Sequence, residues 1–164
     1  MGDKKSMLKG QEATLAVYSA VVARRLQWDN LLWQVPVVSF TAQAFLLNVS
    51  LAPNSSLFAR LVSSALASIV SVLCIHLMAK HRQSEVLDAE TLKRMEAELP
   101  ELLHQHGTAW GDRRAAMPRE RGLVHFFIRP TGRAYPVWIV GLFAFFVVSA
   151  TIFVLSLAAP QLLE

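Results

Sequence analysis

Three long apolar segments constrain this sequence more than any other feature. They cover residues 31–51, 57–79 and 136–160, and each is long enough as a helix to cross the roughly 30 Å hydrocarbon layer of a bilayer. Only 17% of the residues are charged and 54% are hydrophobic, whereas a soluble domain carries about a quarter charged residues. The sequence therefore predicts an all-α integral membrane protein with three transmembrane helices.

The order of the segments predicts a helical hairpin followed by a third span. Residues 52–56 (APNSS) make a short turn in which proline stops one helix and a serine or asparagine caps the next. Residues 1–30 are expected to form a separate helix at the membrane surface or against the bundle, since their apolar run is too short to span. Residues 80–135 form a cytoplasmic helical and basic segment, and residues 136–160 form the third span.

The basic residues predict the orientation of the spans. All but one of the 16 lysines and arginines lie before the first span or between the second and the third. The positive-inside rule then places the N-terminus in the cytoplasm and the C-terminus outside. The exception, Arg60, lies at the outer end of the second span, where its charged head is expected to extend into water.

The first span carries two stripes of polar residues. At about 100° per residue, one face carries Gln34, Thr41 and Asn48. A second stripe, about 140–180° away around the helix, consists of Ser39, Gln43 and Ser50. Two opposed stripes cannot both face lipid. The second span offers small residues that permit close helix packing, namely Ser64, Ala67, Ser68 and Ser71.

Two interpretations of the stripes remain open. In one, both stripes make hydrogen bonds between helices, and the protein is an oligomeric anchor. In the other, Gln34, Thr41 and Asn48 line a pore at the axis of a homo-oligomer, because three helices alone cannot enclose water.

The segment between the second and third spans carries two further patterns. An apolar seam, which is expected to pack on the N-terminal helix or on a neighbouring subunit, consists of Leu92, Met95, Leu99 and Leu102. A basic cluster consists of Arg113, Arg114, Arg119, Arg121, Arg129 and Arg133. Such arginines can hold anionic lipid at about 1 kcal/mol each, or a phosphate-bearing ligand such as a nucleotide.

Catalytic chemistry is not indicated. The chain contains none of the metal-binding, nucleophile-elbow or phosphate-loop motifs, and the single cysteine, Cys74, excludes an intrachain disulfide. The sequence therefore predicts no enzyme, no cofactor, no metal and no nucleic-acid partner.

Two stretches resemble the SLATT-type small bacterial membrane proteins. They are AQAFLLNVSLAPNSSLFARL at residues 42–61 and LMAKHRQSEVLDAETLKRMEAEL at residues 77–99, and the resemblance covers about residues 10–107. It implies a bacterial inner-membrane protein acting as an effector of nucleotide-signalled antiphage defence, by pore formation or membrane disruption. The third span is additional to the two-span pattern of that family, and no functional residues follow from the resemblance.

The function expected from the sequence is conduction. An oligomeric inner-membrane pore for ions or small solutes, gated from the cytoplasmic segment, accounts for the polar stripes. The alternative is a non-conducting scaffold that recruits a cytoplasmic protein. A secondary transporter is disfavoured because broken helices and paired intramembrane charges are not evident.

Overall fold

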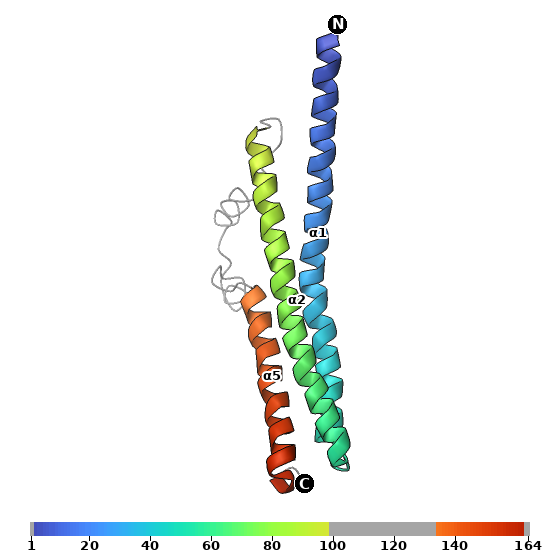
Figure 1. Ribbon diagram of the computed structural model, residues 1–164, viewed down its shortest axis with the longest axis vertical. Helices are drawn as coiled ribbons and strands as arrows, with labels where there is room; N and C mark the ends of the chain where they lie inside the picture. The colour runs from blue at the N-terminus through green and yellow to red at the C-terminus, as the bar shows by residue number, and fades with distance from the viewer. Residues whose placement is uncertain (1, 99–133, 163–164) are drawn as a thin grey trace, which may run out of the picture. The chain divides into compact units, whose positions relative to one another are not determined.

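The computed structural model is all-helical over residues 2–98 and 134–162, the part of the chain that it describes. Helix α1 covers Gly2–Leu51, α2 covers Leu57–Glu98 and α5 covers Ala134–Ala158, followed by a short 3-10 helix, η1, at Pro160–Leu162 (Figure 1). Each of α1, α2 and α5 is long and apolar enough to cross a membrane. The predicted fold class, all-α with three such helices, is confirmed.

Helix α1 is one continuous helix, whereas the sequence suggested a separate helix before the first span. Residues 11–35 contain neither glycine nor proline, so nothing in this stretch ends the helix. The helix also continues through Pro36, which is fully buried. The polar residues near Asn30 are therefore part of the continuous helix and do not form a loop between two helices.

Helix α2 begins at the short turn that the sequence predicts. The Ser55 N–H donates to the carbonyl of Ala52 at 2.9 Å, and the Ala59 N–H donates to Ser56 Oγ at 3.2 Å. Ser56 therefore acts as the N-cap of α2. From there α2 continues to Glu98, since no helix breaker interrupts the passage from apolar to polar sequence.

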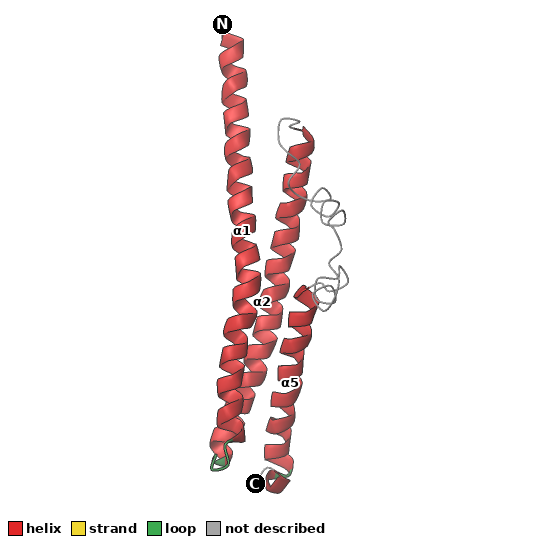
Figure 2. Cartoon of the chain, turned by 180° about the vertical axis from the view of Figure 1, so that it is seen from behind, coloured by secondary structure: helices red, strands yellow, loops and turns green. Residues whose placement is uncertain are grey.

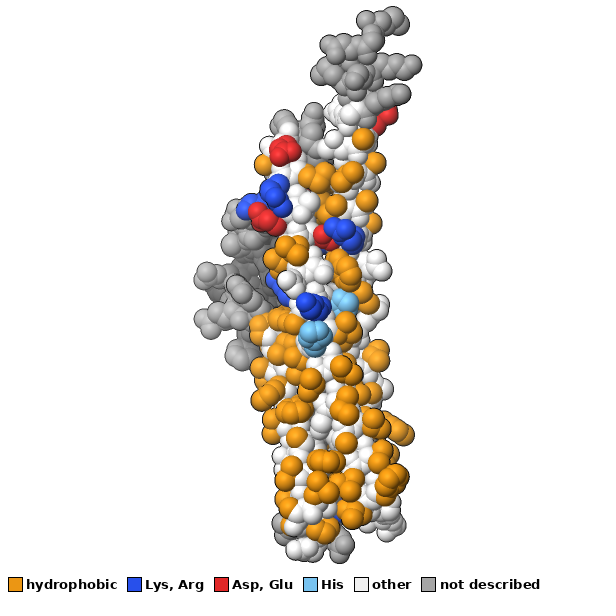
Figure 3. Space-filling view, viewed as in Figure 1, with side chains coloured by type: hydrophobic (Ala, Val, Ile, Leu, Met, Phe, Trp, Pro, Cys, Tyr) orange, Lys and Arg blue, Asp and Glu red, His pale blue; other side chains and the backbone are white. Residues whose placement is uncertain are grey.

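The chain divides into two compact units. We call Met1–Asn30 with His81–His125 the polar unit, and Leu31–Lys80 with Phe126–Glu164 the apolar unit. Within each unit α1 and α2 run side by side in opposite directions (Figure 2). Hydrophobic side chains cover the visible face of the apolar unit (Figure 3).

The contact between α1 and α2 in the polar unit is largely polar. On α2 the buried side chains recur at spacings of three and four, and they are Glu85, Asp88, Leu92 and Glu96. Met95 is half-buried, while Leu99 and Leu102 of the predicted apolar seam lie outside the described residues. Apolar residues such as Leu26 and Leu87 are exposed instead, each by 61%. The two described members of the predicted seam thus lie on the inner face of α2, and acidic side chains, Glu85, Asp88 and Glu96, share that face with them.

Helix α5 packs on α1 in the apolar unit through aromatic rings. The ring of Phe40 lies 5.1 Å from that of Trp138 and 5.1 Å from that of Phe145, between centroids. Gly141 makes room for this ring, because a Cβ atom at that position would lie 2.9 Å from Phe40 Cζ. The opposite side of α5 exposes mostly valine, phenylalanine and leucine, as a lipid-facing surface would.

Candidate functional site

One polar stripe of α1 is buried against α2. Gln43 is fully buried, and its Nε2 donates to the Ala67 carbonyl at 2.8 Å and to Ser71 Oγ at 2.8 Å. Ser50 Oγ and Ser63 Oγ lie 2.6 Å apart. These contacts join the two helices by hydrogen bonds, which are the principal directional forces between helices in lipid.

The small residues of α2 lie on this same contact surface. Ser64, Ala67 and Ser71 are fully buried. Ser68 is half-buried and donates to the Ser64 carbonyl of its own helix at 3.0 Å. The structure thus brings the Gln43 stripe together with three of the four residues predicted for helix packing.

The other polar stripe of α1 faces away from the protein. Gln34, Thr41 and Asn48 are all exposed. Thr41 Oγ1 donates to the Val37 carbonyl of its own helix at 3.1 Å. No side-chain hydrogen bond joins the amides of Gln34 or Asn48 to any described residue. The stripe extends over about 21 Å of helix at about 1.5 Å per residue, which is most of the hydrocarbon thickness.

The first ion pair of the polar unit joins Arg24 to Asp88. Arg24 Nε donates to Asp88 Oδ2 at 2.8 Å and Arg24 Nη2 donates to Oδ1 at 2.5 Å. This two-pronged geometry is the strongest form of a charge-assisted hydrogen bond. The Arg24 guanidinium is the main cause that lowers the pKa of the Asp88 carboxyl below its ordinary value.

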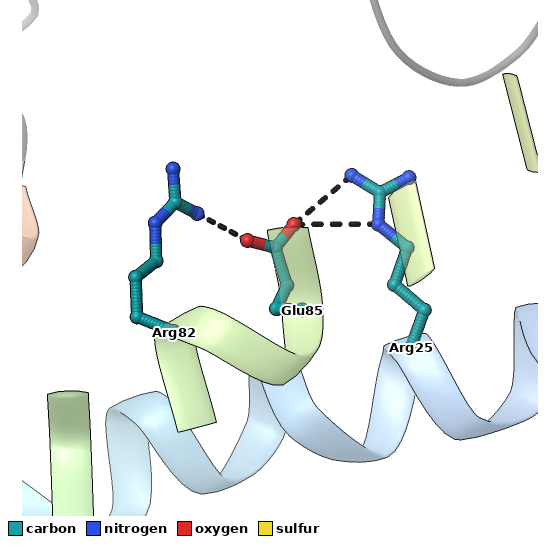
Figure 4. Close-up of polar contacts among 3 residues, drawn as sticks. All are labelled: Arg25, Arg82 and Glu85. Atoms are coloured by element: carbon teal, nitrogen blue, oxygen red, sulfur yellow. Dashed lines mark hydrogen bonds and ion pairs between the residues drawn. The ribbon is translucent and has the colours of Figure 1, made fainter. Parts of the chain in front are cut away.

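The second contact is a carboxylate shared between two arginines. Arg25 Nε and Nη2 both donate to Glu85 Oε1, at 3.3 and 3.1 Å, while Arg82 Nη1 donates to Oε2 (Figure 4). The side chain of Glu85 is only 10% exposed and that of Arg25 is 23% exposed. Glu85 therefore links α1 to α2 in a largely dehydrated position.

Two contacts involving aromatic residues complete the polar unit. Tyr18 Oη donates to Glu96 Oε1 at 2.9 Å. Burial, together with this hydrogen bond, raises the pKa of Tyr18 to about 12, so the donor keeps its proton at any physiological pH. The ring of Trp28 lies 5.4 Å from that of His81.

The polar unit supplies the residues that sequence reasoning missed. The signal was present as complementary charge: arginines on α1, and acidic residues at three- and four-residue spacing on α2. The predicted basic cluster from Arg113 to Arg133 lies outside the described residues. In the described ranges, 2–98 and 134–162, no group of histidine, cysteine, aspartate or glutamate could hold a metal ion.

These features define a class: an all-helical chain compatible with a multi-pass membrane protein, with a hydrogen-bonded helix pair and an exposed polar stripe. Comparison with protein-family models, with curated proteins and with solved structures gives no match to this chain. What it does must therefore be inferred from the geometry of its own residues.

The Asp88 contact predicts a pH dependence. A carboxyl whose pKa is lowered by folding adds stability above its ordinary pKa of 3.8, and this contribution is lost as the pH falls through the folded-state pKa. We expect the thermal midpoint of the detergent-solubilised protein to fall below about pH 4. Asp88→Asn should remove part of this acid sensitivity, and an unchanged pH profile in that variant would contradict the assignment.

Proposed function

We propose that this chain is a homo-oligomeric membrane protein that conducts ions or small solutes through a pore lined by Gln34, Thr41 and Asn48. The observation that carries the proposal is the unequal use of the two polar stripes of α1. Gln43 and Ser50 of one stripe form hydrogen bonds with α2, whereas the Gln34 stripe is exposed and no described residue forms a hydrogen bond with the amides of Gln34 or Asn48.

The exposed stripe needs an occupant other than lipid. An amide left without a hydrogen-bond partner in hydrocarbon costs several kcal/mol, and α1 carries two exposed amides, Gln34 and Asn48, each three residues inside an end of the span 31–51. Water or the same stripe of another copy would satisfy both. Val38 and Phe45 flank the stripe, 69% and 68% exposed, and supply apolar area on which a neighbouring copy can pack.

The basic residues support an orientation for this assembly. With the N-terminus in the cytoplasm of a bacterium and the C-terminus outside the inner membrane, the polar unit is cytoplasmic. It would then be the place where a cytoplasmic protein or nucleotide changes the conducting state. A gated pore of this kind is also what the resemblance to SLATT-type effectors of antiviral defence implies.

Flux measurements test the proposal. Protein reconstituted in liposomes should release a trapped ion or dye, and Thr41→Leu or Asn48→Leu should reduce the rate several-fold, because an apolar lining raises the barrier for a hydrated solute. Val147→Leu on the exposed side of α5 is the matched control and should leave the flux unchanged. A monomer in detergent, or normal flux in both stripe variants, would refute the pore.

A non-conducting scaffold is the second candidate, and one observation favours it. The polar unit exposes large apolar side chains on α1, among them Leu15, Val17 and Leu26. Apolar residues exposed outside a membrane often mark a binding surface for another protein. A scaffold would show no flux at any protein density and would bind a soluble partner, and Leu26→Gln should weaken that binding.

A further inference from the structure

One exposed face of α1 in the polar unit carries no charge. Its residues recur at spacings of three and four, which places them on one side of the helix, roughly opposite the side that packs on α2. Arg24, at the edge of this face, is held by Asp88 of its own chain. We call the face the outer face of α1, and it consists of Ala13, Ala16, Ala20, Ala23, Gln27 and Asn30.

The exposed side of α2 in the same unit has a different composition. Glu90, Arg94 and Glu98 are exposed there at four-residue spacing, as on an ordinary water-facing helix. The outer face of α1 has alanines and amides instead. It is bordered by Val17 and Leu26, which are 55% and 61% exposed. Its composition is therefore that of a packing surface, while the exposed side of α2 is suited to water.

The two amides of the outer face indicate what packs there. No side-chain hydrogen bond joins the amide of Gln27 or Asn30 to any described residue. An amide both donates and accepts, so two copies of the same amide can satisfy each other when they lie level. Parallel identical helices bring equal residues level, and asparagine at such a position fixes the register of parallel coiled coils. A second copy inserted in the membrane in the same orientation meets this requirement.

The spacing of the outer face continues into the stripe of the proposed pore. Gln34, Thr41 and Asn48 follow Ala20 and Gln27 in steps of seven residues. The positions that face α2 keep the same period, and all of them are half or fully buried: Tyr18, Arg25, Leu32 and Ser39. A helix that holds a seven-residue period on one side holds it on the other. The outer face and the pore stripe therefore follow one line along α1.

The length of this line matches what a specific interface needs. From Ala13 to Asn48 it covers about 53 Å at about 1.5 Å per residue, and a helix is about 10 Å wide. Each copy would thus contribute about 500 Å², and two copies about 1,000 Å², the lower limit for a specific protein interface. The pore stripe alone supplies less than half of this area.

We propose that the outer face of α1 packs in parallel on the same face of a second copy of this chain, outside the membrane. The alanines let the two backbones approach closely, as small residues do between other helices, and Val17 and Leu26 cover the sides of the contact. The proposal rests on the homo-oligomer of the proposed function. It does not rest on conduction, because a scaffold could assemble through the same contact.

Cysteine cross-linking in isolated membranes tests the contact, because the chain has a single natural cysteine, Cys74. In a Cys74→Ser background, Ala20→Cys should form a disulfide-linked dimer on mild oxidation, since a disulfide requires Cα atoms within about 7 Å. Asp29→Cys is the matched control. Asp29 is exposed on the same helix but lies about 100° around it from Asn30, so it should cross-link at least tenfold less.

A charge on the outer face should weaken the assembly. Ala20→Glu places equal charges opposite each other, and the apparent dissociation constant of the oligomer in detergent should rise at least tenfold. Ala97→Glu makes the same change at an exposed position of α2 and should leave the constant unchanged. Both sites are exposed, so the thermal midpoint should stay within a few degrees of the wild type in each variant.

The outcomes separate this contact from the pore. A cross-link through Ala20→Cys without flux in liposomes supports the contact and removes the pore. A cross-link through Thr41→Cys, but none through Ala20→Cys, leaves the assembly of the stripe and overturns the contact, as would equal cross-linking at Asp29→Cys. Equal weakening by Ala20→Glu and Ala97→Glu also overturns it. Where Ala20→Glu fails to fold, the cross-links alone decide.

Discussion

Replacing Glu85 by lysine is expected to separate α1 from α2 in the polar unit. Glu85 accepts hydrogen bonds from Arg25 and Arg82, so a lysine there would gather three positive charges with little water around them. Removing one partner of a buried pair costs about 3–5 kcal/mol, and reversing its charge costs more. The free energy of unfolding of the purified protein should fall accordingly.

Glu90 provides the matched control on the same helix. Its side chain is 57% exposed, and its ion pair with Lys93, the one it makes within residues 2–98 and 134–162, is long at 3.9 Å. Glu90→Lys should therefore change stability by no more than about 0.5 kcal/mol. The exchange Arg25→Glu with Glu85→Arg should restore part of the loss. Equal effects at Glu85 and Glu90 would show that the shared carboxylate does not hold the helices together.

The second large effect is expected at Gly141. Leucine there has no space, because even a Cβ atom would lie 2.9 Å from Phe40 Cζ, and the Phe40 ring is held between Trp138 and Phe145. Overpacking of this kind costs about 1–3 kcal/mol or more, so the packing of α5 on α1 should be lost. A lower thermal midpoint and faster proteolysis near the start of α5 would report this.

Two further variants separate crowding from a general effect of losing glycine. Gly10 has nothing within 4 Å of an added Cβ, so Gly10→Ala should stabilise α1 by up to about 1 kcal/mol through helix propensity. Gly141→Ala should destabilise instead. Phe40→Ala should partly rescue Gly141→Leu, since it empties the space that leucine needs. Additive losses in that double variant would exclude the proposed clash.

The helices were predictable because a membrane-spanning helix requires a long apolar run. Residues 57–79 and 136–160 are runs of this kind. Which stripe of α1 packs on α2 was not predictable from spacing, since both stripes repeat along the same helix. The choice depends on what each side chain meets. Gln43 reaches the main-chain carbonyl of Ala67, which the small alanine side chain leaves accessible, while Thr41 forms a hydrogen bond within its own helix.

The polar unit was harder to predict for a related reason. Pattern reasoning assigns leucines to the inside of a helix pair, yet here Leu87 is exposed while Glu85 and Asp88 are buried. Each of those carboxylates is compensated by an arginine about 60 residues away in the sequence. The complementary charges are present in the sequence, but which arginine pairs with which carboxylate becomes visible only once the two helices are aligned.

The contacts of Gln43 and Ser50 limit how the apolar unit can move. A slide of α2 along α1 by one helical turn, about 5.4 Å, would break all of these hydrogen bonds together. An intermediate register would not keep them either. In the described residues α5 contacts α1 through the rings of Phe40, Trp138 and Phe145 rather than through side-chain hydrogen bonds, so a small shift of α5 breaks no directional bond. A conformational change inside this unit should therefore move α5 relative to the α1–α2 hairpin, while α1 and α2 keep their register.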